Sequence, residues 1–98
     1  MSEKNPLVSV TVCVRDGVDW IDGCLESLVA QTYRPLEIIG IDDGSSDGSK
    51  EKLLAWHQKE SDIPIRISTQ GAKGLSAGRQ LAVEQAQGKW VAITDIDV

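Results

Sequence analysis

The sequence predicts an α/β protein, a three-layer, doubly wound, open parallel sheet with the element order βαβαβαβ. Two observations predict it. Short apolar runs rich in β-branched residues alternate with longer segments in which apolar residues recur at helical spacing. Strands that alternate with helices pair in parallel through right-handed crossovers, and near-continuous apolar strands fit a sheet that is covered on both faces.

The first two strands are expected at residues 8–14 and 36–41. Residues 8–14 read Val-Ser-Val-Thr-Val-Cys-Val, which is typical of a buried strand. A helix follows, with apolar residues at helical spacing over residues 21–29 and Asp19 as its expected N-cap. The second strand leads into a predicted loop over residues 42–48, which is dense in turn-forming residues.

A second helix is expected after this loop. Asp47 or Ser49 is the predicted cap, and the helix is predicted to run to about Glu60. Three of its apolar side chains are expected to face inward: Leu53, Leu54 and Trp56. Because the chain has no Phe, Trp56 and Trp90 are both expected to fill space between helices and sheet.

The last part of the chain completes the alternation. Residues 65–68 form the third predicted strand, and a helix of small residues is expected over residues 75–87. Gly88 is expected to end that helix as a C′ glycine. Residues 90–94 then form the fourth strand, which the remaining residues follow.

The composition limits the class of protein. With 98 residues, of which 41% are hydrophobic, the chain is expected to hold one domain over residues 7–98, after a disordered tail over residues 1–6. A formal net charge of −5 argues against nucleic-acid binding, because phosphate backbones need surfaces rich in Lys and Arg.

The sequence also bears on location. It has no run of about eighteen apolar residues and its N-terminus is polar, which predicts neither a transmembrane helix nor a secretory signal peptide. Its two cysteines, Cys13 and Cys24, are too few for a disulfide scaffold and lack the spacing of a zinc site. We therefore expect reduced thiols and a cytoplasmic location, and leave membrane association of the full-length protein open.

Acidic residues follow three of the predicted strands: Asp16, then Asp42 and Asp43, then Asp95 and Asp97. In an open parallel sheet the ligand binds outside the carboxyl ends of the strands, so these side chains are expected at one rim. Crowded carboxylates repel one another, and a bound cation removes that cost; carboxylate oxygens favour Mg²⁺ or Mn²⁺. The alternative, that these residues are solvated turn aspartates, stays open at this stage.

Other nucleotide-binding folds fit less well. The segment after the first strand lacks the G-x-G-x-x-G of a dinucleotide-binding domain, and no P-loop is present. A receiver domain needs an aspartate after the third strand, and a nucleotidyltransferase typically needs a Gly-rich loop with a basic residue after the first; both are missing. An anionic nucleotide at an acidic rim needs a metal between them, which favours a metal-dependent nucleotide-sugar site.

Several separated segments resemble family 2 glycosyltransferases of the GT-A fold. In order along the chain they are residues 8–10, 25–33, 37–48, 74–79, 86–90 and 95–97. The resemblance implies the strand order 3-2-1-4, with a nucleotide lying across the first, second and fourth strands. It identifies residues 7–98 as the nucleotide-sugar-binding half of such a domain.

The resemblance also implies roles for single residues. Asp43 matches the aspartate that hydrogen-bonds a uracil-type base, and Cys13 stands where the backbone lies near the base. Asp95 and Asp97 match the D-x-D pair, the first near the ribose and metal and the second a metal ligand. Arg79 matches a basic residue near the diphosphate.

The implied ligands are a nucleotide-sugar donor and Mg²⁺ or Mn²⁺. A donor of the UDP type is favoured, and the acceptor is unknown. Arg15 and Asp16 stand where the family usually has Tyr-Asn, and we include both in the predicted donor-binding set. The implied reaction is an inverting transfer, in which a general base deprotonates the acceptor hydroxyl.

Family members usually carry that base and the acceptor site in a second half, and no residue here matches the base. We therefore expect a truncated domain that binds the donor but does not complete transfer. The alternative is a non-catalytic interaction module that retains the fold and pairs with another chain. The order 3-2-1-4 places the fourth strand at an exposed edge, and such an edge invites pairing with a further strand.

Overall fold

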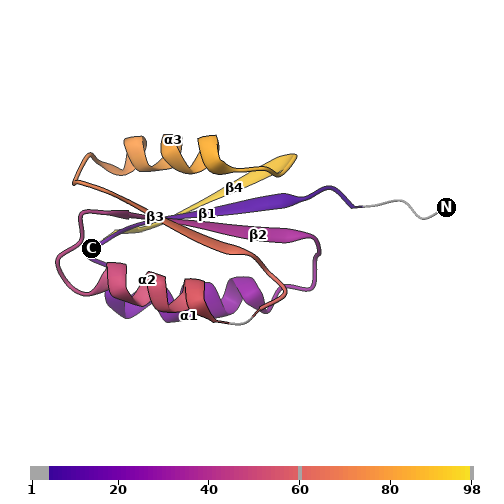
Figure 1. Ribbon diagram of the computed structural model, residues 1–98, viewed down its shortest axis with the longest axis horizontal. Coiled ribbons are helices and arrows are strands. Elements are labelled where there is room, and N and C mark those ends of the chain that lie inside the picture. Colours follow the sequence, from indigo (N-terminus) through magenta and orange to yellow (C-terminus); the bar gives the residue numbers. More distant parts are fainter. Residues whose placement is uncertain (1–4, 60, 98) are drawn as a thin grey trace.

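The computed structural model describes residues 5–59 and 61–97, with Asp97 described by its backbone alone. The elements follow the predicted order: β1 (Val8–Arg15), α1 (Val18–Val29), β2 (Leu36–Asp43), α2 (Ser49–Gln58), β3 (Ile65–Gln70), α3 (Leu75–Gln85) and β4 (Trp90–Asp97). The strands pair in parallel in the order β3-β2-β1-β4. In Figure 1, α3 covers one face of the sheet and α1 and α2 cover the other. The predicted three-layer α/β fold is confirmed.

Two apolar clusters hold the layers together, one on each face of the sheet. Because side chains alternate along a strand, Val12 and Val14 of β1 pack with Ile21 of α1. On the opposite face, Cys13 of β1 packs with Ala82 of α3. All five side chains are fully buried. The alternation therefore fixes which residues of each strand face α3.

Three predictions about helix ends are wrong. The N-cap of α1 is Gly17, so that Asp19 lies in the first turn instead of before it. The N-cap of α2 is Gly48, with a φ of 96° that favours glycine, and the helix ends at Gln58; Glu60 lies outside the described residues. These shifts are of one or two residues, the usual uncertainty in a helix end.

Helix α3 ends at Gln85, two residues before the predicted end, and Gly88 is not its C′ residue. Gly88 instead lies against β1, where its N–H donates to Ser9 Oγ at 2.8 Å. A Cβ at this position would lie 2.6 Å from Ser9 Oγ and 2.7 Å from the Leu7 carbonyl oxygen. The glycine is thus required by close packing and not by helix termination.

The strands are longer than predicted at their carboxyl ends. Asp42 and Asp43 belong to β2, because they pair with Thr69 and Gln70 of β3. The backbone of Asp95 belongs to β4 and pairs with β1. Acidic residues that the sequence placed in loops are therefore held at fixed positions in the sheet.

One of the two tryptophan predictions is confirmed. Trp56 is buried between α2 and the sheet, whereas Trp90 is 61% exposed. Trp90 begins β4, an edge strand, which has one neighbouring strand in the sheet that the structure describes. Leu54, predicted to face inward, is 37% exposed, because it lies a third of a turn from buried Leu53.

No helix within residues 5–59 and 61–97 combines the length and the apolar character needed to cross a bilayer.

Candidate functional site

The candidate site lies on the α3 face of the sheet, at the carboxyl ends of β1, β2 and β4. Cys13 pairs in register with Asp95, and Arg15 with Asp97. Asp43 ends β2 on the same face, and Arg79 reaches this face from α3. Five of the predicted site residues are therefore brought together: Cys13, Arg15, Asp43, Arg79 and Asp95.

Asp43 is fully buried, and both of its carboxylate oxygens accept hydrogen bonds from the protein. Oδ1 accepts from the backbone N–H of Lys73 at 2.7 Å and from Gln70 Nε2 at 2.9 Å. The N–H of Gly74 reaches both oxygens, at 3.2 and 3.1 Å. Arg15 Nη1 lies 3.7 Å from Oδ2. The carboxylate thus holds the β3–α3 loop against the end of β2.

Gln70 was not among the predicted site residues. It is the last residue of β3 and pairs in register with Asp43, and its amide donates both to that carboxylate and to the carbonyl of Gly74. The signal that identifies it is alternation: Ser68 and Gln70 are two residues apart in a strand and share one face. The predicted set consists of charged residues and Cys13, and it therefore omits this neutral amide.

Arg79 and Asp95 form an ion pair across the site. Arg79 Nε donates to Asp95 Oδ2 at 2.9 Å, and Nη2 donates to the same oxygen. These bonds raise the pKa of the Arg79 guanidinium. The other oxygen, Asp95 Oδ1, is buried and has no hydrogen-bond partner among the residues that the structure describes. One half of this carboxylate is therefore open to a further donor or to a cation.

Cys13 lies beneath this pair and is fully buried. Burial raises the pKa of its thiol to about 11; the Asp95 and Asp43 carboxylates add to the rise, and the Arg79 charge opposes it. The thiol is therefore protonated near neutral pH, as expected of a small buried side chain and not of a nucleophile.

Asp16 does not join the cluster. It has a φ of 52°, and its Oδ1 accepts from the N–H of Ser46 at 2.8 Å while its own N–H donates to Ser45 Oγ at 2.9 Å. Its carboxylate therefore ties the β1–α1 loop to the β2–α2 loop. Its predicted role in donor binding stays a prediction.

The acidic side chains of the predicted rim that the structure describes do not all face the same way. Asp42 is buried on the α1 and α2 side of β2, where Oδ2 accepts from the N–H of Ser45 at 3.3 Å. The side chain of Asp97 lies outside the described part of the structure. Among the side chains that are described, no three His, Cys, Asp or Glu residues gather as a metal site would need. Among the described side chains at this end of the face, Asp43 and Asp95 are each paired with an arginine.

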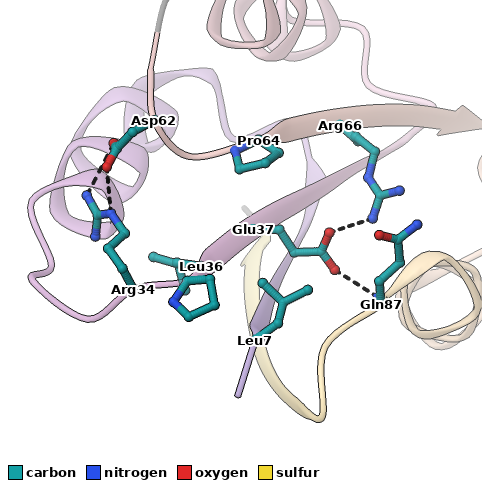
Figure 2. A pocket seen from close by; sticks show the side chains of 9 residues that line it. Leu7, Arg34, Leu36, Glu37, Asp62, Pro64, Arg66 and Gln87 are labelled. Atoms are coloured by element: carbon teal, nitrogen blue, oxygen red, sulfur yellow. Dashed lines mark hydrogen bonds and ion pairs between the residues drawn. The ribbon is translucent and has the colours of Figure 1, made fainter. Parts of the chain in front are cut away.

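A separate hollow of about 530 Å³ lies at the amino ends of the strands, away from this cluster. Figure 2 shows Leu7, Leu36 and Pro64 on its walls, with Glu37 between Arg66 and Gln87. Arg66 Nη2 donates to Glu37 Oε1 at 2.7 Å, so the buried charge is neutralised within the protein. Parallel sheets bind ligands at the carboxyl ends, and we therefore place the candidate site there despite the size of this hollow.

The geometry can be compared with known proteins. The model of the family described as Glycosyl transferase family 2 matches residues 9–98. The chain belongs to glycosyl transferase family 2. The observed strand order β3-β2-β1-β4 is the order that the resemblance to this family implied.

Two bacterial glycosyltransferases illustrate how much of its relatives this family 2 domain covers. Over 97 residues it is 39% identical to the uncharacterized glycosyltransferase YibD of Escherichia coli K12, covering 99% of this chain and 27% of the relative. Over 90 residues it is 40% identical to the cholesterol galactosyltransferase of Borreliella burgdorferi, covering 92% of this chain and 25% of the relative. The chain thus spans about a quarter of the length of these relatives.

A solved structure with the same architecture is the mannosyltransferase PcManGT from Pyrobaculum calidifontis, in complex with GDP-Man and Mn²⁺. The TM-score is 0.85 at 26% identity, over 95% of this chain and 28% of that chain. The GT-A fold of the family 2 domain is therefore shown.

Proposed function

We propose that this family 2 domain binds a nucleotide-diphosphate sugar, with a divalent metal, as the donor half of an inverting glycosyltransferase. The observation that carries the proposal is the pairing of Arg79 with Asp95 at the carboxyl ends of the strands. In this pair, a group able to bind phosphate lies beside a carboxylate with a buried oxygen that has no partner among the described residues. The GDP-Man and Mn²⁺ bound by the mannosyltransferase support this interpretation.

The chemistry of the donor set fits a divalent metal. Asp95 Oδ1 is a hard oxygen without a partner among the described residues, and residues two apart in a strand share a face. In the proposal Asp95 and Asp97 would hold Mg²⁺ or Mn²⁺. The metal would stabilise the charge that develops on the departing nucleoside diphosphate.

The other residues bind and orient the donor. Arg79, with its side chain 44% exposed, provides the cationic group for the diphosphate. Asp43 fixes the loop from Gln70 to Gly74, and in the proposal its carboxylate and the backbone beside Cys13 contact the base. We propose a UDP-type donor, and the GDP-Man of the solved neighbour makes GDP the necessary comparison.

The test is a calorimetric titration of the 98-residue chain with UDP and with GDP, each with and without Mn²⁺. We expect binding that requires Mn²⁺, and loss of the metal-dependent part in the variants Asp95→Asn and Asp97→Ala. Glu51→Gln, which removes an exposed carboxylate from α2, is the matched control. Equal weak heats with and without Mn²⁺ for both nucleotides would contradict the proposal. The experiment measures binding and not sugar transfer, because no residue of this chain is assigned as the general base.

A second function, an interaction module, is favoured by one observation. Trp90 and Ile93 of the edge strand β4 are 61% and 53% exposed, and exposed apolar edges promote strand pairing. If this edge pairs two copies, light scattering at rising concentration should show a dimer that Ile93→Lys abolishes. A strictly monomeric chain at high concentration would argue against this function.

A further inference from the structure

The ion pair of the candidate site joins two groups that the proposed function assigns to different partners. Asp95 is assigned to the metal and Arg79 to the diphosphate, yet in the structure they bind each other. Both donated hydrogen bonds from Arg79 go to Oδ2, and Oδ1 remains buried without a partner among the described residues. Neither group can meet its assigned partner in full while this pairing persists.

We propose that Arg79 is an exchangeable counter-ion: without ligands it neutralises Asp95, and it moves to the diphosphate of the donor as a divalent cation takes its place on that carboxylate. The inference rests on the proposed function and adds a coupling between the two ligands. A guanidinium cannot lose its proton in a protein, so Arg79 can leave Asp95 only by moving.

The residues around the ion pair limit the anions to which Arg79 can donate. Asp43, the other carboxylate described at the carboxyl ends of the strands on this face, is occupied by Arg15 and by backbone N–H groups, so it offers Arg79 no alternative partner. The donor's diphosphate is thus the anion to which Arg79 can transfer its hydrogen bonds.

The backbone of Arg79 lies in a closely packed part of α3, while its side chain is partly exposed. Gly78, the preceding residue, is buried, and a Cβ there would lie 3.5 Å from Cys13 Sγ, so α3 approaches β1 closely at this point. The Arg79 side chain itself is 44% exposed. Helix α3 therefore fixes the position of the Arg79 backbone. From there the long side chain can extend to Asp95 or to the diphosphate of the donor.

Two opposite effects of Arg79 follow. When a cation binds alone, Arg79 competes for Asp95 and weakens binding. When the diphosphate is present, Arg79 has a new partner, and the competition is relieved. Metal and nucleotide should therefore bind with positive coupling, and the coupling is reciprocal by thermodynamic linkage.

The test measures Mn²⁺ affinity of the 98-residue chain by the electron paramagnetic resonance signal of free Mn²⁺, first without nucleotide. Arg79→Gln should bind Mn²⁺ alone about five-fold or more tightly than the unaltered chain, and should bind the nucleoside diphosphate with Mn²⁺ more weakly. Lys89→Gln, which removes the same charge from an exposed residue at the amino end of β4, controls for net charge. Thermal melting checks that each variant is folded.

The outcomes separate the inference from the proposed function. In one outcome the unaltered chain binds nucleotide with Mn²⁺, but Arg79→Gln binds Mn²⁺ alone no more tightly than Lys89→Gln does. That outcome would contradict the exchange of Arg79 and leave the proposed donor-binding function intact. If the unaltered chain shows no Mn²⁺-dependent nucleotide binding, the proposed function fails as well. In an Asp95→Asn background, Arg79→Gln should leave Mn²⁺ affinity unchanged; a persistent increase would overturn competition at Asp95.

Discussion

At the scale of single residues, Asp43 shows how one buried carboxylate can hold a loop at the end of a strand. It is fully buried, and backbone N–H groups of Lys73 and Gly74 donate to it together with the Gln70 amide. Charge-assisted hydrogen bonds of this kind are stronger than neutral ones. Its contribution to donor binding would therefore depend on the loop that it holds in place.

The first prediction is that Asp43→Asn destabilises the chain by about 1–3 kcal/mol, because an amide cannot accept at both positions and leaves buried donors unpaired. The free energy of unfolding from urea titrations is the measurement. Asp62→Asn is the control: Asp62 is an exposed aspartate, paired with Arg34, at the other end of the sheet. A loss no greater than that of the control would show that the loop does not depend on the buried carboxylate.

At the scale of elements, Asp47 connects the starts of two helices. Its Oδ1 accepts from the N–H and the hydroxyl of Ser49 at the start of α2, and its Oδ2 accepts from the N–H of Val18 at the start of α1. Nearby, the N–H of Gly17 donates to Ser49 Oγ at 3.0 Å. One side chain thus satisfies helical N–H groups that have no partner within their own helices.

The second prediction concerns the pH dependence of this connection. Hydrogen bonds, first that from Ser49 Oγ, lower the pKa of Asp47 below its ordinary 3.8. The stabilisation is therefore present above about pH 4 and is lost as the pH falls through the lowered value. Asp47→Ala should cost about 0.5–1 kcal/mol at pH 6, and the difference from the unaltered chain should shrink at pH 3. Urea unfolding at both pH values measures it.

Two outcomes would contradict this assignment. A difference that is unchanged at pH 3 would mean that the ionised carboxylate is not what stabilises the helix starts. An equal loss in Asp19→Ala, which removes an exposed acidic side chain from the first turn of α1, would point to a general charge effect at that helix.

The third prediction contrasts two glycines in the connections on either side of α3, Gly88 and Gly71. Gly88→Ala would place a Cβ 2.6 Å from Ser9 Oγ and 2.8 Å from its backbone nitrogen, so β1 and the α3–β4 connection must separate. We expect a loss of about 1–3 kcal/mol from overpacking. Gly71→Ala is the matched control, because a Cβ at this position would have no other atom within 4 Å. We expect this variant to change the stability little. Thermal unfolding of both variants is the measurement, and equal stability would refute the close packing.

At the scale of the whole molecule, the layered fold could be predicted because strand composition and helical spacing are local signals. The pairing of side chains across elements could not. Arg79 and Asp95 were both predicted, but 16 residues separate them and no local rule says that they bind each other. Trp90 was misplaced for a related reason: an apolar residue at the start of a strand does not reveal how far the helices cover the edge.

The last prediction concerns how stability is distributed across the sheet. β1 lies between β2 and β4, and Val12 and Val14 are fully buried, whereas β4 is an edge strand with Val91 and Ile93 exposed. Amides of β1 should therefore exchange with solvent deuterium through global unfolding, and those of β4 that bond to β1 through easier local opening. Hydrogen exchange at low protein concentration, with increasing urea, measures both. Amide exchange in β4 as slow as in β1 would refute this difference in stability between the two strands. If exchange in β4 becomes slower as the protein concentration rises, the β4 edge is the surface where two copies pair.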